Sequence, residues 1–328
     1  MSEVVEDRAG RVLSGRYELI EPLGQGGMAV VWRGIVRGSD GFTRPVAIKR
    51  IDASCRGFDE VLEMFVEEAR VGGRLQHPNI VQVYDVGVDE AGERYLVTEL
   101  VRGIHLREWV NLLRDDGELP PWELVGAVGV EVLRALDAAH SHLDGNGSSA
   151  PILHRDVTPT NILLDLSGVV KLADFGLARA GDRARMTRPN VVKGKLAYLA
   201  PELLMGRPPS VQTDLFSLGV VLWEALTGKR LFDAETDLDV VRQVQRTLVP
   251  LLSRERPSLP LGLSELVHRA LDREPEQRHP TARAMLESLT EILRVLPRSV
   301  DAPALGASVQ RARGLKREAE AQTAKKPA

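Results

Sequence analysis

The sequence predicts an α+β protein in which a small β-rich lobe precedes a larger helical lobe. Short apolar runs separated by glycine turns dominate the chain up to about residue 101. Helical periodicity dominates from about residue 102 to 296. Because strands and helices are segregated along the chain rather than alternating, we expect two lobes instead of a parallel α/β sheet.

Each lobe has its own predicted elements. In the first lobe we expect strands at 17–20, 30–32, 46–49, 80–86 and 94–98, and one helix that carries apolar residues from 61 to 69. In the second lobe we expect helices at 122–142, 214–227, 263–271 and 281–296, with an irregular stretch at 144–200. Asp214 is the predicted N-cap of its helix.

Both ends of the chain differ in composition from the lobes. Residues 1–16 are polar and lack the apolar core of a signal peptide, so we expect a disordered leader. Residues 297–328 are rich in alanine, lysine and arginine, and we expect a basic tail or linker. A docking role for this tail is the less favoured alternative to simple solvation.

Composition excludes several classes of protein. Hydrophobic residues make up 43% and charged residues 27% of the 328 residues, which is typical of a soluble globular chain. The formal net charge of −3 argues against nucleic acid or a membrane surface as the main partner. Cys55 is the only cysteine and no run of about 18 apolar residues occurs, so we expect a cytoplasmic protein without a membrane segment.

A glycine-rich segment, Gly24-Gln25-Gly26-Gly27, lies between the first two predicted strands. Glycines let backbone N–H groups approach a phosphate closely, although an ordinary β-turn is also rich in glycine. Ala29 stands where a third glycine would complete a G-x-G-x-x-G pattern. A dinucleotide-binding fingerprint would open a helix, whereas this segment continues as a strand.

Lys49 ends the strand Val46-Ala47-Ile48-Lys49. It is either a surface lysine or an ammonium group that binds phosphates and is held by a carboxylate. The following helix supplies Glu67 and Glu68, and the spacing to the downstream His77-Pro78-Asn79 favours Glu68.

The strongest signal is His154-Arg155-Asp156, followed by Asn161 and then by Asp174-Phe175-Gly176. Carboxylate and carboxamide oxygens on irregular loops are the hard ligands that suit Mg²⁺ bound to phosphates. A short H-R-D alone occurs often by chance and can be a simple turn. The full combination at this spacing is highly specific.

Together with Ala200-Pro201-Glu202, Asp214 and Arg278, these motifs give the chain a clear resemblance. From about residue 17 to 296 it resembles the eukaryotic-like (Hanks-type) serine/threonine protein kinases, above all their bacterial branch. The resemblance implies a protein kinase domain over 17–296 with the bilobal kinase fold and ATP bound between the lobes. It implies transfer of the γ-phosphate to serine or threonine hydroxyls of proteins, in signalling.

The resemblance also implies roles for individual residues. Lys49 pairs with Glu68, Asp156 orients the substrate hydroxyl, and Asn161 and Asp174 bind Mg²⁺, with Mn²⁺ as the alternative metal. Glu202 and Arg278 form a buried ion pair, and Asp214 anchors the catalytic loop. The residues implied to contact ATP, including the gatekeeper and hinge, are Leu23, Gly24, Gly26, Gly27, Val31, Ala47, Lys49, Thr98, Glu99, Val101, Asn161, Leu163 and Asp174.

Two positions depart from the family pattern. Serine/threonine kinases carry a lysine two residues after the catalytic aspartate, where this chain has Thr158. They carry a threonine after the glycine that precedes A-P-E, where this chain has Lys195. We therefore expect Lys195 to project from the opposite loop into the place near Asp156 that a lysine at position 158 would fill, with Thr158 as its hydrogen-bond partner, since a flexible ammonium can serve from either side. The alternative is that Lys195 is solvated and phosphate binding is weaker.

The resemblance suggests two regulatory features. Arg155 precedes the catalytic aspartate, and Thr187 is the only serine or threonine between residues 177 and 200, so Thr187 is the expected autophosphorylation site. The alternative is an unmodified loop threonine. Gly72 lies where the family packs a larger residue, so we expect an unfilled place and a helix that needs a regulatory partner or a homodimer.

Two other functions remain open on sequence alone. Ala29, Thr158 and Lys195 are compatible with a pseudokinase that binds ATP as a scaffold with little turnover. A small-molecule phosphotransferase is the third reading. The A-P-E segment and the long activation loop favour a protein substrate.

Overall fold

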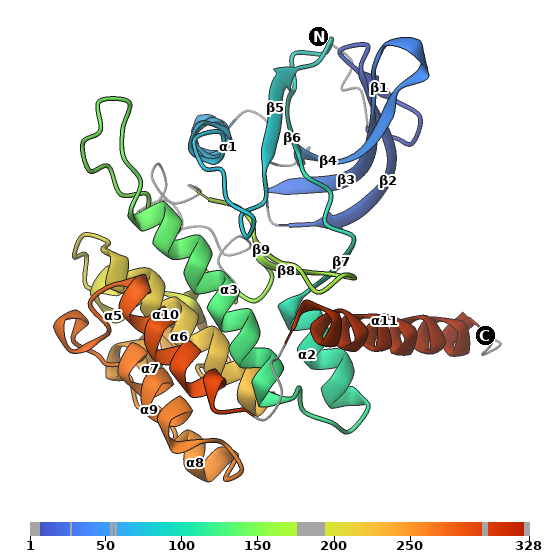
Figure 1. The fold of residues 1–328 in the computed structure, drawn as a ribbon. Helices are drawn as coiled ribbons and strands as arrows, with labels where there is room; N and C mark the ends of the chain where they lie inside the picture. Colours follow the sequence, from blue (N-terminus) through green and yellow to red (C-terminus); the bar gives the residue numbers. More distant parts are fainter. Residues whose placement is uncertain are drawn as a thin grey trace. The chain divides into compact units, whose positions relative to one another are not determined.

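The computed structural model describes residues 7–26, 28–52, 55, 58–175, 194–296 and 301–324. The chain forms two compact units. The first comprises residues 1–77, 81–101 and 174–193, and the second comprises residues 78–80, 102–173 and 194–328. The predicted α+β class, with strands gathered early and helices late, is confirmed by the elements of the two units (Figure 1).

The first unit is built on an antiparallel six-stranded sheet in the order β1-β2-β3-β4-β6-β5. Each of its predicted strands is present, and the strand expected at 80–86 begins later, at Val83. The strands are β1 Val12–Leu13, β2 Tyr17–Gln25, β3 Ala29–Arg37, β4 Thr43–Ile51, β5 Val83–Val88 and β6 Arg94–Thr98, with a 3₁₀ turn at Ser39–Gly41.

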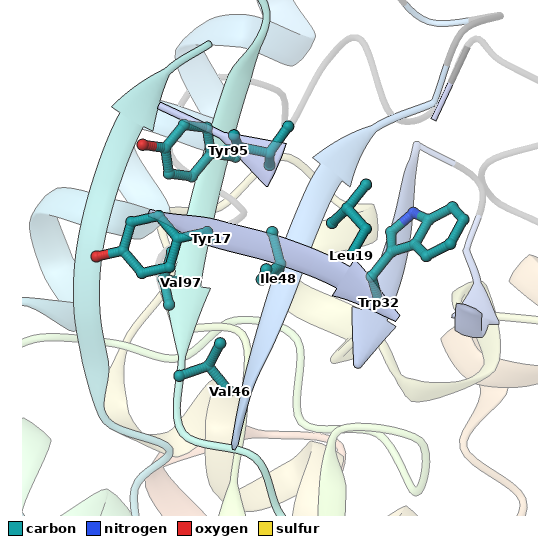
Figure 2. Close-up of a cluster of buried hydrophobic side chains, with 8 residues drawn as sticks. Tyr17, Leu19, Trp32, Val46, Ile48, Tyr95 and Val97 are labelled. Atoms are coloured by element: carbon teal, nitrogen blue, oxygen red, sulfur yellow. The ribbon is translucent and has the colours of Figure 1, made fainter. Parts of the chain in front are cut away.

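A hydrophobic cluster fills one face of this sheet (Figure 2). Tyr17 and Leu19 alternate with more exposed neighbours along β2, as expected of a strand buried on one face. The rings of Tyr17 and Tyr95 lie 5.6 Å apart in a tilted pair, and Trp32 closes the other end of the cluster beside Leu19. This packing fixes the strand register that positions the functional side chains described below.

The expected disordered leader differs from the structure at residues 7–16. Leu13 is fully buried in the cluster, and β1 pairs with β2 through Val12 opposite Glu18 and Leu13 opposite Tyr17. Two apolar residues are too few to give a periodic signal, so only the tertiary contact identifies this strand.

A buried network of charges holds the same segment. Arg50 is 1% exposed, and it pairs with Asp7 at 3.0 Å and with Asp89 at 2.8 Å. Arg11 also pairs with both aspartates, at 2.7 and 2.8 Å. Two guanidinium groups facing two carboxylates satisfy charges that could not be buried singly.

The helix predicted around 61–69 is α1, Asp59–Gly72. Its apolar face packs with Ile51 and Leu96 of the sheet, and Cys55 is buried in this cluster. The prediction of an unfilled place beside Gly72 was wrong. A Cβ at Gly72 would lie 2.5 Å from Cγ2 of Val83, so Val83 already fills the place that we expected to be empty.

The second unit is mainly helical and carries one small sheet in the order β7-β8-β9. The four predicted helices correspond to α3, α6, α9 and α10, while α2, α7 and α11 were not predicted. The bounds are β7 Gly103–His105, α2 Leu106–Asp115, α3 Trp122–His140, β8 Ile162–Asp165, β9 Val170–Leu172, α5 Pro201–Leu204, α6 Val211–Thr227, α7 Asp237–Arg246, α8 Leu252–Glu255, α9 Leu261–Ala270, α10 Ala282–Arg294 and α11 Ala302–Ala324, with 3₁₀ turns η4 Leu196–Tyr198 and η5 Pro275–Gln277.

Helix α6 is the centre of this unit, since almost all its residues are buried. It begins at Val211 rather than at Asp214. Ser210 is its N-cap, and Ser210 and Thr213 form a reciprocal capping box. The prediction that Asp214 caps the helix was therefore wrong, and its carboxylate is available for another role.

Helix α11 replaces the expected tail over most of its length (Figure 1). Leu305 and Val309 are buried, and Ser308 accepts a hydrogen bond of 3.1 Å from the indole of Trp109 in α2. Arg311 pairs with Asp116 and Glu118 on the same side. The composition suggested a solvated segment because its apolar residues are few and small. Within the described residues, no helix is long and apolar enough to cross a membrane.

We expect the buried face of α11 to stabilise the second unit. Val309→Asp would place an unpaired carboxylate among buried side chains and lower the free energy of unfolding by ~3 kcal/mol or more. Ala307→Asp, on the exposed face of the same helix, is the matched control and would change it by under ~0.5 kcal/mol. Urea unfolding followed by circular dichroism measures both. Equal effects of the two changes would contradict the packing of α11.

Candidate active site

The glycine-rich turn joins β2 to β3 in the first unit. Gly24, next to the last residue of β2, lies beside open space, since a Cβ there would meet nothing within 4 Å. Gly26 N donates to Ala29 O at 2.8 Å and closes the turn, while Gly27 lies outside the described residues. Leu23, just before the turn, is 50% exposed. The turn thus presents backbone and one apolar side chain to a ligand.

Strand register gathers four of the predicted ATP contacts on one face of the sheet. Val31 lies opposite Lys49 in the β3–β4 pair, and Ala47 lies opposite Thr98 in the β4–β6 pair. Lys49 and Ala47 are two residues apart, so all four side chains leave the same face. Beyond Thr98, Glu99 N donates to Gln82 O at 2.9 Å, which fixes the start of the segment leading to Val101.

Lys49 is the centre of a buried charge cluster in the first unit. Its Nζ donates to both carboxylate oxygens of Glu68 at 2.8 Å and to Oδ1 of Asp174 at 3.0 Å. Burial opposes the charge, but the carboxylates of Asp174 and Glu68 raise the pKa of Lys49 above its usual range. Glu67, the rejected alternative, pairs with Arg70 instead.

Asp174 has an unusual backbone. Its φ is +64°, in the left-handed region that a non-glycine residue rarely adopts. Such a conformation persists only where the surroundings impose it, and it is typical of functional loops. Its carboxylate keeps partial exposure, 32%, while it binds Lys49.

The loop that contains Asp156 lies in the second unit. Asp156 is 6% exposed and receives two hydrogen bonds from Asn161 Nδ2, at 2.9 Å to its carbonyl and 3.0 Å to Oδ2. His154 Nε2 bonds to Ala173 O at 2.9 Å, and Leu163 continues from Asn161 into β8. The loop therefore returns on itself and holds a carboxylate at a fixed place.

Asp214 anchors this loop from the interior of α6. It is fully buried, and its two carboxylate oxygens accept from His154 N at 2.9 Å and Arg155 N at 2.7 Å. His140 Nε2 lies 2.8 Å from the same carboxylate. Burial acts to raise the pKa of Asp214, but these hydrogen bonds and the histidines lower it overall. Arg155 has a φ of +62°, so the anchor also holds a strained residue.

His140 is the contributor that the sequence did not reveal. It is in the last turn of α3, a position where a histidine commonly interacts with the helix C-terminus alone. Its distinguishing feature is the contact with Asp214 of α6, which is 74 residues away in the sequence, so no local sequence pattern indicates it.

Lys195 lies close to Asp156, as the exchange hypothesis expected. Its Nζ donates to Oδ2 of Asp156 at 2.6 Å, while the side chain remains 39% exposed. The second part of the hypothesis is not supported, since the Thr158 hydroxyl pairs with Thr160 at 3.0 Å rather than with Lys195. Gly194, with φ +93°, makes the turn that presents Lys195.

Glu202 and Arg278 form the predicted ion pair inside the second unit. Both side chains are almost fully buried, and the guanidinium makes two parallel bonds of 2.8 Å to the two carboxylate oxygens. The remaining guanidinium donors reach the carbonyls of Asp272, Gln212 and Arg273. Every donor is satisfied, which is the condition for burying such a pair.

Thr187 falls within 176–193 and lies outside the described residues. Among the described residues, no cluster of three or more His, Cys, Asp or Glu side chains could hold a metal ion by itself.

Asp214→Asn should loosen the loop that carries Asp156. One of the two loop N–H groups would then face an NH₂ group, which costs ~1–3 kcal/mol of stability. Thermal unfolding measures this cost, and Asp115→Asn at an exposed position is the control, with no change expected. An unchanged melting temperature for Asp214→Asn would show that the anchor is dispensable.

Comparisons with known proteins agree with this arrangement. Residues 17–289 match the family model described as "Protein kinase domain". The chain is 38% identical over 295 residues to "Serine/threonine-protein kinase PknL" of Mycobacterium bovis, covering 89% of this chain and 70% of the relative. It is 37% identical over 279 residues to "Tyrosine-protein kinase MasK" of Myxococcus xanthus, covering 85% of this chain and 43% of the relative.

The structural comparison gives the same answer. The chain resembles the crystal structure of the Mycobacterium tuberculosis PknI kinase domain with a TM-score of 0.65 and 27% identity, covering 88% of this chain and 99% of that one. The chain spans less than half the length of MasK. The motifs, the fold and these matches lead to one conclusion: this chain belongs to the protein kinase family and resembles its bacterial Hanks-type members.

Proposed function

We propose that the chain is an ATP-dependent protein kinase that phosphorylates serine or threonine hydroxyls of proteins. One observation carries the proposal: Asp156 is a buried carboxylate held by Asn161 and Lys195 on a loop anchored by Asp214. A carboxylate fixed in this way can orient a hydroxyl without itself moving. The relative PknL, named a serine/threonine-protein kinase, supports the residue class.

The residues present fit ATP and Mg²⁺. Lys49 offers a buried ammonium for phosphate oxygens, and Asp174 offers a partly exposed carboxylate with a strained backbone. Asn161 uses its Nδ2 toward Asp156, so its amide oxygen is the atom assigned to the metal. A bound Mg²⁺ would neutralise charge on the phosphates, with Mn²⁺ as the alternative.

In the proposed reaction, the substrate hydroxyl oxygen forms a bond to the γ-phosphorus while the bond from that phosphorus to the β,γ-bridging oxygen breaks. ADP leaves with the bridging oxygen, and the hydroxyl proton passes toward Asp156. The transition state is loose and spreads negative charge over the phosphoryl oxygens. Positioning by Asp156 and positive charge from Lys49 are therefore the main contributions of this chain.

Lys195 is the proposed substitute for the lysine that the family carries two residues after the aspartate. Its contact with Asp156 places an ammonium group beside the carboxylate that receives the hydroxyl. An ammonium there can stabilise the transferred phosphoryl group as a point charge. The name of MasK leaves tyrosine as the acceptor to be tested beside serine and threonine.

Regulation and location extend the proposal. A phosphate on Thr187 would pair with basic side chains such as Arg155, which precedes Asp156. We place the enzyme in the cytoplasm, where its single cysteine remains reduced. A homodimer or regulatory partner remains a prediction, and its original reason, an unfilled place at Gly72, no longer applies.

Incubation with labelled ATP and Mg²⁺ tests the activity. We expect label on the wild-type chain at Thr187 or another hydroxyl, and at least ~10²-fold less on Asp156→Asn, because orientation of the nucleophile is lost. Mass spectrometry identifies the acceptor residue. Absence of label on the chain and on a generic acceptor protein, with ATP still bound, would favour the pseudokinase.

A residue exchange tests Lys195. We expect Lys195→Ala to lower kcat by ~10²-fold, on the scale of losing one preorganised charge in the transition state. Thr158→Lys in that background should recover part of the loss by restoring the lysine to its usual position. Lys316→Ala, an exposed lysine of α11, is the control. Wild-type turnover by Lys195→Ala would refute the assigned role.

A further inference from the structure

A pocket of about 260 Å³ opens in the second unit between α2 and the C-terminal end of α6. Its floor is apolar and comes from buried residues of both helices, Leu106, Val110, Val221 and Ala225. Pro159, from the loop that carries Asp156, completes the wall. The pocket is thus formed by two rigid helices and one functional loop.

The polar lining of this pocket is strongly unbalanced in charge. Arg107, Arg114, Lys229 and Arg230 line it, against the single carboxylate of Glu224. Such a concentration of cations over an apolar floor attracts an anionic group and disfavours a cationic one.

The innermost cations keep an excess of positive charge after their own contacts are counted. Arg107 and Arg230 both donate to the Tyr198 hydroxyl, at 2.9 and 2.7 Å, and that hydroxyl donates to Glu224 at 2.5 Å. Burial and the neighbouring Glu224 raise the pKa of Tyr198, so the phenol is neutral. Within the described lining of the pocket, the guanidinium groups of Arg107 and Arg230 therefore have one carboxylate, that of Glu224, to balance their two positive charges. Nε of Arg107 is buried and has no hydrogen-bond acceptor among the described residues.

Within the described residues, Arg114 and Lys229, the outer cations of the pocket, form only surface ion pairs. Arg114 pairs with Asp115, and Lys229 pairs with Glu255. The side chains of Arg114 and Lys229 are 47% and 65% exposed, and surface pairs of this kind contribute little to stability. Arg114 also donates to Gly228 O at 3.3 Å, at the end of α6. Both side chains can turn toward a ligand at small cost.

The pocket adjoins the reacting groups along the chain. Pro159 is three residues from Asp156, so their Cα atoms are at most ~11 Å apart. Arg230 donates to Gly194 O at 3.4 Å, and Gly194 precedes Lys195. Because an extended peptide advances ~3.3 Å per residue, the pocket is within reach of a side chain about three residues from the phosphorylated hydroxyl.

We propose that this pocket binds an acidic side chain of the protein substrate and makes the enzyme prefer acidic sequences. The proposal rests on the proposed kinase function. Its carboxylate ligand would lie within about three residues of the acceptor hydroxyl and would bond to the guanidinium groups of Arg107 and Arg230.

A peptide series tests the preference. Each peptide has one serine, threonine or tyrosine in an alanine–glycine background, with glutamate or lysine at one of the three positions on either side. We expect glutamate at the best position to raise kcat/KM about tenfold over alanine, the scale of one charge-assisted hydrogen bond. Lysine there should lower it, and the preference should shrink as salt is added. The change should lie in KM.

Variants assign the effect to the pocket. Lys229→Glu and Arg107→Glu should abolish or invert the preference, while Arg294→Glu, an exposed arginine of α10, should keep it. Autophosphorylation measured in the same samples separates the two proposals. Absence of label on the wild-type chain, on every peptide and on a generic acceptor protein defeats the kinase proposal. Autophosphorylation with equal or better use of lysine peptides overturns the acidic pocket, and the wild-type series decides this even if a variant fails to fold.

Discussion

The carboxylate of Asp214 is the constraint on which the geometry of the second unit depends. It is fully buried in α6 and accepts the backbone N–H groups of His154 and Arg155 directly before Asp156. A loop has no repeating hydrogen bonds of its own, so its shape must be imposed by fixed acceptors elsewhere. With its backbone held, Arg155 can keep a positive φ and Asp156 can receive Asn161 and Lys195 without reorganisation.

The first unit also depends on one buried charged group, the ammonium of Lys49. The ammonium of Lys49 is shared by Glu68 and Asp174, so a buried cation is stabilised by two carboxylates. The register of the sheet determines the neighbours of Lys49, because it places Lys49 beside Ala47 and Val31 on a single face. A phosphate group would bind the same ammonium as Asp174 and Glu68. Lys49 therefore has an anionic partner, and stays charged, whether or not a nucleotide is bound.

The two unusual features of this kinase meet in one region of the second unit. Lys195 brings an ammonium to Asp156, and Arg230 bonds to the carbonyl of the preceding Gly194. Tyr198, in the same segment, holds the arginines that line the pocket next to α2. The segment that carries Lys195 thus also contacts the arginines of the pocket, so the proposed lysine exchange and the proposed preference for acidic substrates concern the same part of the second unit.

The sequence by itself determined the lobes, the main strands and helices, and the motifs around Asp156, Asp174 and Lys49, because these depend on local periodicity and on fixed spacing. It could not determine α11 or β1, whose few apolar residues acquire meaning only when Val309 and Leu13 are buried by distant partners. The tertiary structure also decided that Ser210 caps α6 while Asp214 serves the loop, and that Val83 occupies the space beside Gly72. The proximity of Lys195 to Asp156 was inferred from the two departures from the family pattern, Thr158 and Lys195. Only the tertiary structure decides the geometry of this contact, because the two residues are 39 positions apart in the sequence.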